Sequence, residues 1–233
     1  MTNKRIIVIG GGPAGHDAAN SAARFGADVI LVERDIVGGA AHLRDCVPSK
    51  SMIATGGALS FARRIDGMGL ANVETGVDAE HLRARIREIE HRLEQSVTEI
   101  LTSQGVKIYK GTGRLLGPNE VSVETADESF ELAADAIVLA TGSRPRIPEW
   151  APIDHERVLT TRDSYPPVEM PEHLIVIGSG VTGVEFVHMF ASLGSEVTLI
   201  VSRQQVLPQK DPEAAALLEQ NFLDRGVQLL KGA

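Results

Sequence analysis

The sequence predicts an α/β protein with two doubly wound, parallel-sheet units of the Rossmann type, the first carrying a helical insertion and a small β-meander. Two observations predict this fold. The glycine pattern G-x-G-x-x-G occurs twice, at Gly10–Gly15 and at Gly178–Gly183. Each copy follows an apolar, β-branched run and precedes a helix-like stretch, which is the order of strand, glycine turn and helix in a dinucleotide-binding unit. Two such copies in one chain are far more specific than one.

Composition limits the class of protein. The 233 residues are 43% apolar and 23% charged, which is ordinary for a soluble globular protein. A net charge of −8 argues against a nucleic-acid partner. A single cysteine fits a reducing compartment, and no stretch approaches the roughly 20 apolar residues that cross a bilayer. We therefore expect a cytoplasmic protein with no nucleic-acid partner and no membrane span.

The first glycine turn has a role for each glycine. Residues 4–9 form an apolar run that is typical of a buried parallel strand. Gly10 permits the tight turn, Gly12 lets the backbone approach a pyrophosphate, and Gly15 lets the helix pack closely on the strand. The pyrophosphate is expected at the N-terminus of that helix, where free N–H groups favour an anion.

The rest of this unit is in register with the turn. A helix is expected over His16–Phe25 and a second strand over Asp28–Val32, which ends at Glu33. An acid about 20 residues past the glycines is placed to bond a ribose hydroxyl. His16 and His42 have no metal-ligand spacing, so we expect structural roles for both and no metal site.

Two helices are expected next. Pro48 suits a first helical turn, so a helix is expected over Ser49–Arg64, with Gly56-Gly57 as a weak point. A glycine-rich loop is expected over Asp66–Val77, and Asp78 is expected to cap a long helix. One face of that helix is apolar and is expected to pack on its own domain: Leu82, Ile86, Ile89, Leu93, Val97 and Ile100. The charged residues are expected on the other faces: Arg83, Arg85, Arg87, Glu88, Glu90 and Glu94.

Short strands follow this helix. The stretch Val106–Leu132 predicts β-like runs separated by turns at Gly111–Gly113 and Gly117–Asn119. Another buried strand is expected over Asp135–Ala140, running into Thr141-Gly142. The proline-rich stretch Arg144–Pro152 is expected to link the two nucleotide units.

The second unit repeats the first, with one difference. Strands are expected over Leu174–Ile177 and Glu196–Val201, with a helix over Val181–Leu193 between them. The acid at the end of the second strand is missing, because Val201 stands there, followed by Ser202 and Arg203. Arg203 could pair with a 2′-phosphate, which favours NADPH or dual use, or it could be a solvated surface residue. A helix over Asp211–Arg225 and a strand over Gly226–Leu230 are expected next.

The segment Gly38–Lys50 reads G-G-A-A-H-L-R-D-C-V-P-S-K. It resembles the segment G-G-T-C-x-N-x-G-C-x-P-S-K of the class I pyridine nucleotide-disulfide oxidoreductases, in which the two cysteines form a redox disulfide beside the flavin. Here Ala41, Leu43 and Asp45 replace the first cysteine, the asparagine and the glycine. The form with a single cysteine is most similar to lipoamide-dehydrogenase-like NAD(P)H:quinone reductases.

The resemblance implies a domain order and two cofactors. Residues 1–150 correspond to an FAD-binding domain and residues 151–233 to an incomplete NAD(P)-binding domain. Family members continue well beyond this length and form homodimers largely through a C-terminal domain, so we expect this chain to be C-terminally truncated. The expected cofactors are FAD and NAD(P)H.

The resemblance also assigns site residues. Lys50 and Glu185 are expected to pair near the flavin N5, and Cys46 is expected to be a buried packing or charge-transfer residue. Cofactor contacts are expected at the glycine turns and at the segments that follow the strands: Gly10, Gly12, Pro13, Ala14, Gly15, Glu33, Arg34, Gly39, Ala40, Lys50, Gly113, Ala140, Thr141, Gly142, Gly178, Gly180, Val181, Thr182, Gly183, Glu185, Ser202 and Arg203.

Three functions follow from these observations. The first is an FAD-dependent NAD(P)H dehydrogenase that acts on a quinone-like acceptor without a redox disulfide. The second is a single-cysteine flavoprotein that reduces peroxides or disulfides through Cys46. The third is a truncated, non-catalytic FAD-binding fragment.

Overall fold

The computed structural model describes residues 3–63, 65 and 76–233, and the chain forms two compact units. Unit 1 comprises residues 1–47 and 85–165, and unit 2 comprises residues 48–84 and 166–233. The expected division at residue 150 concerns which nucleotide each segment binds, and it stays a prediction. Most of the loop expected over Asp66–Val77 lies outside the described residues.

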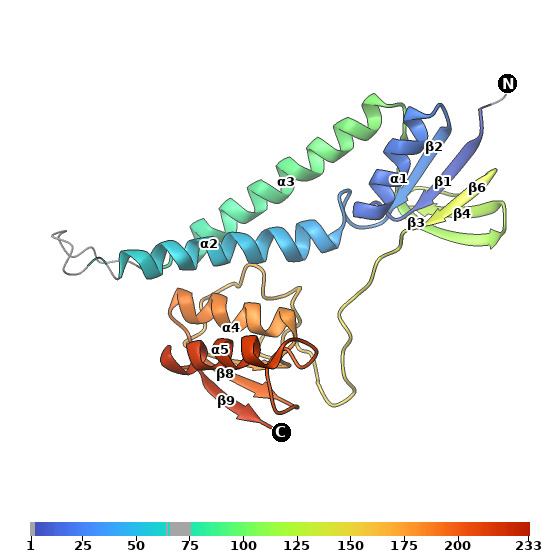
Figure 1. Ribbon diagram of the computed structural model, residues 1–233. Coiled ribbons are helices and arrows are strands. Elements are labelled where there is room, and N and C mark those ends of the chain that lie inside the picture. Colours follow the sequence, from blue (N-terminus) through green and yellow to red (C-terminus); the bar gives the residue numbers. More distant parts are fainter. Residues whose placement is uncertain (1–2, 64, 66–75) are drawn as a thin grey trace. The chain divides into compact units, whose positions relative to one another are not determined.

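Unit 1 is built on a six-stranded sheet with the order β5-β4-β3-β2-β1-β6 (Figure 1). Strands β3, β2, β1 and β6 are parallel to one another, and β3, β4 and β5 form an antiparallel meander. The strands are β1 Arg5–Ile9, β2 Asp28–Glu33, β3 Lys107–Gly117, β4 Glu120–Thr125, β5 Ser129–Ala133 and β6 Ala136–Leu139. The parallel strands and the meander confirm the predicted fold class for this half of the chain.

Both faces of the unit 1 sheet are covered. Successive strand residues point to opposite faces, so each strand contributes to two cores. On one face, Ile7, Ile9, Ile30 and Val32 pack against residues of the meander that include Val123. On the other face, Val8, Val29 and Leu31 of the strands pack against helix α1 (Pro13–Arg24) and the end of helix α3 (Ala79–Ser103). Ala19 of α1, Leu101 of α3 and Val106 belong to the same cluster.

Strand β3 corrects one sequence-based expectation. The turn expected at Gly111–Gly113 is wrong, because β3 runs straight through these residues. Its first part pairs with β2, and from Gly111 onward it pairs with β4. A Cβ on Gly111 would lie 2.3 Å from the carbonyl oxygen of Glu124, so this glycine permits close approach of two strands rather than a turn. The turn at Gly117–Asn119 is confirmed, since β4 begins at Glu120.

The chain becomes helical earlier than expected. A short π-helix spans Ala41–Cys46 (the π-helical turn), and helix α2 follows directly over Val47–Ala62. Pro48 lies in the first turn of α2, where its missing N–H is tolerated. Helix α2 continues through Gly56 and Gly57, so the weak point expected there does not interrupt the helix. A Cβ on Gly56 would lie 2.7 Å from Cβ of Ser192, so this glycine permits close packing within unit 2.

Helix α3 follows its expected pattern only in part. Asp78 caps the helix by accepting a hydrogen bond from the backbone N–H of His81 at 2.9 Å. Leu82 and Ile86 are buried as expected, but Leu93 and Ile100 are exposed and Leu101 is buried in place of Ile100. These residues recur every 3.6 positions on average, so the stripe keeps to one face of the helix, and the exposure of Leu93 and Ile100 shows that this face is covered only in part.

The charged faces assigned to α3 need a second correction. Glu90 was expected on a solvent-facing side of this helix. It is buried instead, and its carboxylate lies 3.9 Å from the guanidinium of Arg44 in the π-helical turn. The ion pair explains how a carboxylate is accommodated there, because a buried charge requires a partner.

Unit 2 contains the three-stranded parallel sheet β7-β8-β9, formed by His173–Ile177, Glu196–Val201 and Gln228–Lys231. Helix α4 (Val181–Leu193) and helix α5 (Pro212–Asp224) connect these strands. The core includes stacked rings of Phe186 and Phe190, with centroids 5.8 Å apart. The expected strands and helices of this unit are confirmed to within two residues at each end.

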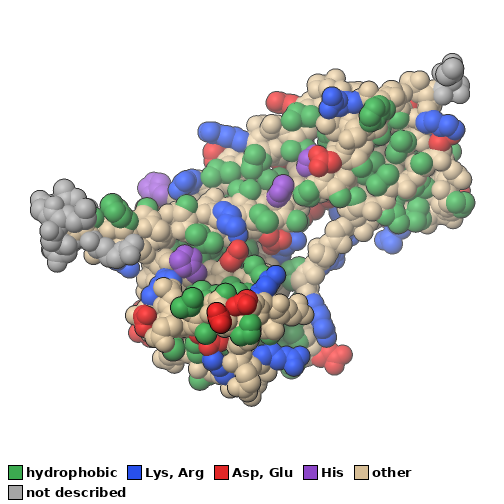
Figure 2. Space-filling view, viewed as in Figure 1, with side chains coloured by type: hydrophobic (Ala, Val, Ile, Leu, Met, Phe, Trp, Pro, Cys, Tyr) green, Lys and Arg blue, Asp and Glu red, His purple; other side chains and the backbone are tan. Residues whose placement is uncertain are grey.

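The surface adds two observations. On the face shown in Figure 2, basic and acidic side chains are interspersed rather than gathered into one basic patch. No helix in the described part of the chain is long and apolar enough to cross a membrane.

The contact at Gly15 generates a stability prediction. A Cβ on Gly15 would lie 1.8 Å from the carbonyl oxygen of Gly10, so Gly15→Ala forces α1 away from the turn. We expect Gly15→Ala to lower the free energy of unfolding by about 1–3 kcal/mol, the usual cost of overpacking. Urea denaturation followed by circular dichroism measures this change.

Gly57→Ala is the matched control for that prediction. Nothing lies within 4 Å of a Cβ on Gly57, which is also in a helix. We expect it to stabilise by up to about 1 kcal/mol, since alanine favours helix. A Gly15→Ala protein as stable as the unmodified chain would contradict the proposed packing role.

Candidate functional site

The first glycine turn leaves the N-terminus of α1 available to an anion. Gly12 is the N-cap of α1 and provides no side chain to accept hydrogen bonds from the first N–H groups, and Pro13 follows it. Gly10 has a positive φ of 104°, and a Cβ there would lie 2.2 Å from the carbonyl oxygen of Ala140. The turn is therefore held tightly against β6, while the helix N-terminus retains backbone donors that favour negative charge.

The second glycine of each turn tests whether a dinucleotide fits. Gly12 and Gly180 both have a φ of −70° with extended ψ, a conformation open to any residue. A Cβ on Gly12 would meet only Gly39, at 3.7 Å, and a Cβ on Gly180 would meet nothing within 4 Å. The protein's own packing therefore does not require glycine at either position. Close approach of a ligand's pyrophosphate does explain it, so the residues present fit a dinucleotide.

The second turn repeats the geometry of the first. Gly178 has a φ of 108°, and a Cβ on Gly183 would lie 1.9 Å from the carbonyl oxygen of Gly178. Val181 and Thr182 begin helix α4 after Gly180, as Pro13 and Ala14 begin α1 after Gly12. The two turns therefore share the close contact between their first and third glycines and the start of a helix after the second glycine.

The ends of the second strands distinguish the two units. Glu33 stands 23 residues after Gly10 and accepts a hydrogen bond from the N–H of Gly11 at 2.6 Å, which places its carboxylate at the glycine turn. Val201 stands 23 residues after Gly178 and is buried. Arg203 is exposed two residues later. Unit 2 therefore has no carboxylate at the position that Glu33 occupies in unit 1.

The segment before the π-helical turn lies directly on the first glycine turn. The N–H of Gly38 donates to the carbonyl of Gly11 at 2.9 Å. Gly39 has a φ of 80°, and a Cβ there would lie 2.3 Å from Cα of Gly12. Ala40 follows this contact immediately. The structure thus brings Gly10, Gly12, Gly15, Glu33, Gly39 and Ala140 together around one turn, as the sequence analysis expected.

Four further residues of the expected cofactor contacts lie in unit 1. Gly113 lies against the side chain of Ile9, because a Cβ on Gly113 would be 3.1 Å from it. After β6, Gly142 has a φ of 64° and open space around its Cα, and Thr141 precedes it. Arg34 is exposed just after β2. Gly142 therefore has room for a ligand beside it, and the contacts of all these residues with a ligand remain a prediction.

The π-helical turn places its only thiol at the surface. The N–H of Val47 bonds to the carbonyl of His42, which is the i to i+5 pattern of a π-helix. We therefore expect Ala41 and Cys46, which are five residues apart, to lie near each other on successive turns (the stacking of positions 41 and 46). Cys46 is exposed, which corrects the expectation that it is buried. Leu43 is the buried residue of the turn and lies where the family pattern has asparagine.

Lys50 and Glu185 form the ion pair that the sequence analysis expected. Lys50 on α2 donates to both carboxylate oxygens of Glu185 on α4, at 2.8 and 2.9 Å, within unit 2. The side chains are 58% and 31% exposed, so the pair contributes only about 0–1 kcal/mol to stability. The stability of the fold therefore does not explain why these two residues are paired.

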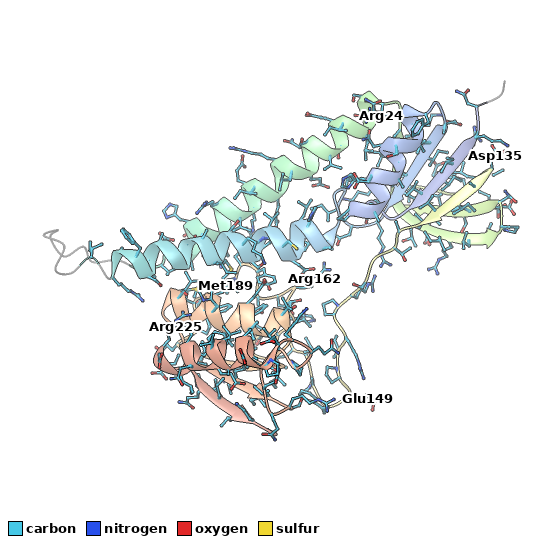
Figure 3. All side chains as sticks on the ribbon, in the orientation of Figure 1. Arg24, Asp135, Glu149, Arg162, Met189 and Arg225 are labelled. Atoms are coloured by element: carbon cyan, nitrogen blue, oxygen red, sulfur yellow. The ribbon has the colours of Figure 1, made fainter. Side chains whose placement is uncertain are left out.

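Sequence reasoning missed one polar network in unit 2. Arg225 (Figure 3) lies beside α5 and reaches the ring nitrogen of His188 at 2.9 Å and the hydroxyl of Ser192 at 2.8 Å. Burial lowers the pKa of His188, and the guanidinium of Arg225 lowers that pKa further. The network joins Arg225 to helix α4, which also carries Glu185. The sequence spacing of these residues contained no signal for it.

Sequence reasoning also missed the partners of the π-helical turn. Arg44 lies 3.9 Å from Glu90 and 4.0 Å from Asp35. Asp45 lies 3.5 Å from Arg162. One feature of the sequence could have indicated such a partner: Asp45 places a charge where the family pattern has glycine.

Two parallel-sheet units with equivalent glycine turns define this chain as a protein of the two-dinucleotide, Rossmann-type class. The chain belongs to the pyridine nucleotide-disulphide oxidoreductase family, whose family model matches residues 4–233. This confirms the family resemblance found in the sequence. Members of the family bind FAD and use NAD(P)H.

Known relatives agree with this assignment. The chain is 40% identical to the Mycobacterium tuberculosis protein named NAD(P)H dehydrogenase (quinone), covering 98% of this chain and 49% of the relative. It is 34% identical to the dihydrolipoyl dehydrogenase of Zymomonas mobilis, covering 97% of this chain and 48% of the relative. The chain therefore spans about half the length of the curated relatives it matches.

Solved structures show the same fold. The crystal structure of LpdA from Mycobacterium tuberculosis superposes with a TM-score of 0.90 at 38% identity, covering 99% of this chain and 51% of that chain. The flavoprotein disulfide reductase RclA from Escherichia coli superposes with a TM-score of 0.83 at 24% identity, covering 98% of this chain and 49% of that chain. At 24% identity, the similarity to RclA shows a shared fold only.

The stacking of positions 41 and 46 generates a chemical prediction. We expect Ala41→Cys to form a disulfide with Cys46 under mild oxidation, because the π-helical turn stacks these positions one turn apart. Thiol titration before and after oxidation measures it, with a loss of both thiols per chain expected. Ala54→Cys is the control, since it adds an exposed thiol elsewhere on a helix. Two titratable thiols persisting in oxidised Ala41→Cys would contradict the stacking.

Proposed function

We propose that this chain forms the nucleotide-binding half of an FAD-dependent oxidoreductase that carries hydride from NAD(P)H to flavin and electrons on to a quinone-like acceptor, without a redox disulfide. The observation that carries the proposal is the make-up of the π-helical turn, which ends at the only thiol, Cys46, and begins at Ala41, where the family pattern has its other cysteine. A disulfide requires two sulfurs, so a two-thiol mechanism is excluded within these 233 residues. The name of the Mycobacterium tuberculosis relative, NAD(P)H dehydrogenase (quinone), supports the acceptor class.

The residues divide between two cofactors in this proposal. Unit 1 would hold FAD, with its pyrophosphate over Gly12 and its ribose hydroxyls at Glu33. Unit 2 would hold NAD(P)H over Gly180, with the residues that follow β8 near the adenosine ribose. The bound flavin would supply two-electron chemistry with the nicotinamide and donate electrons to the acceptor.

The chain's own contribution is electrostatic. The family resemblance assigns Lys50 to the flavin N5, and the two hydrogen bonds that the Lys50 ammonium donates to Glu185 support a fixed orientation of that ammonium. A cation held in a fixed position stabilises negative charge that develops next to it without reorganising during the reaction. We therefore assign Lys50 as the charge-stabilising residue and Glu185 as the residue that positions it.

The choice between NADH and NADPH follows from the ends of β2 and β8. A carboxylate such as that of Glu33 bonds ribose hydroxyls and repels a 2′-phosphate. Unit 2 has Val201 at the equivalent position, and Ser202 and Arg203 follow it. We propose that Arg203 pairs with the 2′-phosphate, which makes NADPH at least as good a donor as NADH. The proposal also includes a cytoplasmic location and homodimerisation, and the family resemblance is what supports the dimer.

The exposure of Cys46 favours a second function. An exposed thiolate can attack a peroxide, releasing an alcohol or water and leaving a sulfenic acid. NAD(P)H would supply the two electrons that restore the thiol. Because position 41 is an alanine, the turn has no second thiol to resolve the sulfenic acid. This disfavours the hypothesis of peroxide reduction relative to the hypothesis of quinone reduction.

An absorbance spectrum of the purified protein tests the main proposal. We expect flavin bands that bleach when NADPH or NADH is added without oxygen and that return when a quinone is added. Cys46→Ala separates the two functions, because it should leave quinone reduction intact and abolish peroxide reduction. Absence of bound flavin would refute the catalytic proposal and favour a non-catalytic fragment.

Lys50 generates a kinetic prediction. We expect Lys50→Met to slow anaerobic flavin reduction by NAD(P)H about 10²-fold, the usual effect of removing one preorganised charge-stabilising donor. Stability should change by less than about 1 kcal/mol, because the Lys50–Glu185 pair is exposed. Stopped-flow absorbance measures the rate, and thermal unfolding measures the stability. Lys50→Arg, which keeps the charge, is the control and should recover part of the rate.

A further inference from the structure

The π-helical turn is attached to unit 1 by ion pairs on two sides. Arg44 lies 3.9 Å from Glu90 of α3 and 4.0 Å from Asp35, which follows β2. Asp45, the next residue, lies 3.5 Å from Arg162. All five residues belong to unit 1. The turn is therefore connected to three separate parts of the chain through two adjacent residues of opposite charge.

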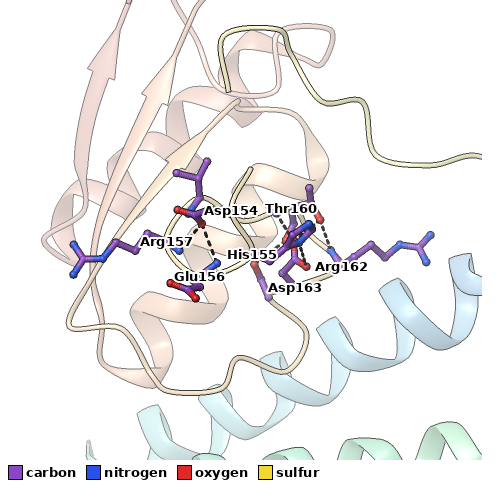
Figure 4. Close-up of polar contacts among 9 residues, drawn as sticks. Asp154, His155, Glu156, Arg157, Thr160, Arg162 and Asp163 are labelled. Carbon is purple, nitrogen blue, oxygen red and sulfur yellow. Dashed lines mark hydrogen bonds and ion pairs between the residues drawn. The ribbon is translucent and has the colours of Figure 1, made fainter. Parts of the chain in front are cut away.

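Arg162 belongs to a segment with its own internal bonds. The carboxylate of Asp154 accepts from the N–H groups of Glu156, Arg157 and Val158 at 2.9, 2.8 and 2.8 Å (Figure 4). These three bonds lower the pKa of Asp154 to about 2. The lowered pKa means that this stabilisation is present above the unfolded pKa near 4 and is lost as pH falls through about 2. The carboxylate of Asp154 is therefore ionised at neutral pH, where it accepts these three hydrogen bonds.

The same segment fixes the backbone at Arg162. Asp163 accepts from both the N–H and the hydroxyl of Thr160 at 2.8 Å, and it pairs with His155 at 2.8 Å. The N–H of Arg162 donates to the hydroxyl of Thr160 at 3.3 Å. The side chain of Arg162 points away from these residues (Figure 4), and its Nε is buried with no hydrogen-bond partner in the described structure.

A gain in the stability of the fold does not explain these ion pairs. Burial raises the pKa of Asp45 although Arg162 opposes the shift. Burial also raises the pKa of Glu90, although Arg44 and Arg87 oppose it. A raised carboxylate pKa means that ionisation is less favourable in the fold, so the folded state loses stability as pH rises from the unfolded pKa through the folded one. At neutral pH both charges therefore destabilise the fold, as partly buried ion pairs often do.

The location of the turn provides the alternative explanation. It begins two residues after Gly39, whose Cα lies against Gly12 of the nucleotide turn, and it ends at the only thiol of the chain. A π-helix is a rare conformation that is found often at functional sites. Charges that lower stability beside such a site are reasonable if they hold its geometry.

We propose that the Asp45–Arg162 and Arg44–Glu90 pairs position the π-helical turn against the first glycine turn and so set the orientation of Cys46. These are positioning residues, since they act through the turn and not on substrate. The role of that orientation in electron transfer rests on the proposed flavin function. The positioning itself can be tested in the chain with or without flavin.

The test uses Cys46 as the reporter, because it is the only cysteine. Alkylation by iodoacetamide is measured from about pH 6 to 10, on either side of the ordinary thiol pKa near 8.5. The profile gives a titration midpoint, which responds to nearby charge, and a plateau rate, which responds to geometry. Asp45→Asn and Arg162→Met are compared singly and together.

We expect both single variants to change the plateau rate in the same direction by about threefold or more, within the coupling range of residues in one ion-pair network. The double variant should show no larger change than either single one. Arg92→Met is the control, because it removes an exposed pair with Glu88 on α3, and it should leave the profile unchanged.

Two outcomes would overturn the proposal. One is an unchanged plateau rate in folded Asp45→Asn. This substitution preserves the size of the side chain, so the variant has the best chance of folding. The other is a pair of opposite midpoint shifts with unchanged plateaus, because a direct charge effect on the thiol reverses sign between Asp45 and Arg162. Circular dichroism confirms that each variant is folded. A chain that binds no flavin refutes the proposed function but leaves this test valid.

Discussion

The close approach between the first and third glycines of each turn is the constraint on which the rest of the structure depends. A Cβ on Gly15 or on Gly183 would lie within 2 Å of the carbonyl oxygen that opens its own turn. This contact brings the helix N-terminus directly over the strand end. The open space at Gly12 and Gly180 exists only because the helices are held there. The contacts made by Glu33 and Gly39 also depend on this placement, since both residues bond to or pack on the first turn.

The π-helical turn shows how the family scaffold accommodates the loss of one thiol. Ala41 removes the disulfide partner, and Leu43 fills the interior where the family pattern has a polar amide. Asp45 introduces a charge where the pattern has glycine, and Arg162 compensates for it only in part. The turn therefore differs from the family pattern at three positions, and its partners in the fold differ with it.

Sequence reasoning predicted the regular elements well because their signals are local. The glycine spacing, the β-branched runs and the Asp78 cap each depend on neighbouring residues only. The errors fall where distant residues decide. The sequence around Gly111 predicts a turn, because the partner of Gly111, the carbonyl of Glu124, is not apparent from sequence. The periodicity places Glu90 toward solvent, because its partner Arg44 lies far away in the chain. A single cysteine is expected to be buried, because most cysteines are, but Cys46 is exposed.

The sequence by itself determined the two nucleotide turns, the fold class, the family and the absence of a second thiol. Each of these follows from residue types at fixed spacings, which act over a few bonds. Only the tertiary structure decided that Arg225 bonds to His188, that residues 41–46 form a π-helix, and that Arg162 reaches Asp45. Those contacts join residues that are far apart in the chain or depend on a rare backbone geometry. Packing and ion pairing across the fold select them, and local propensity does not.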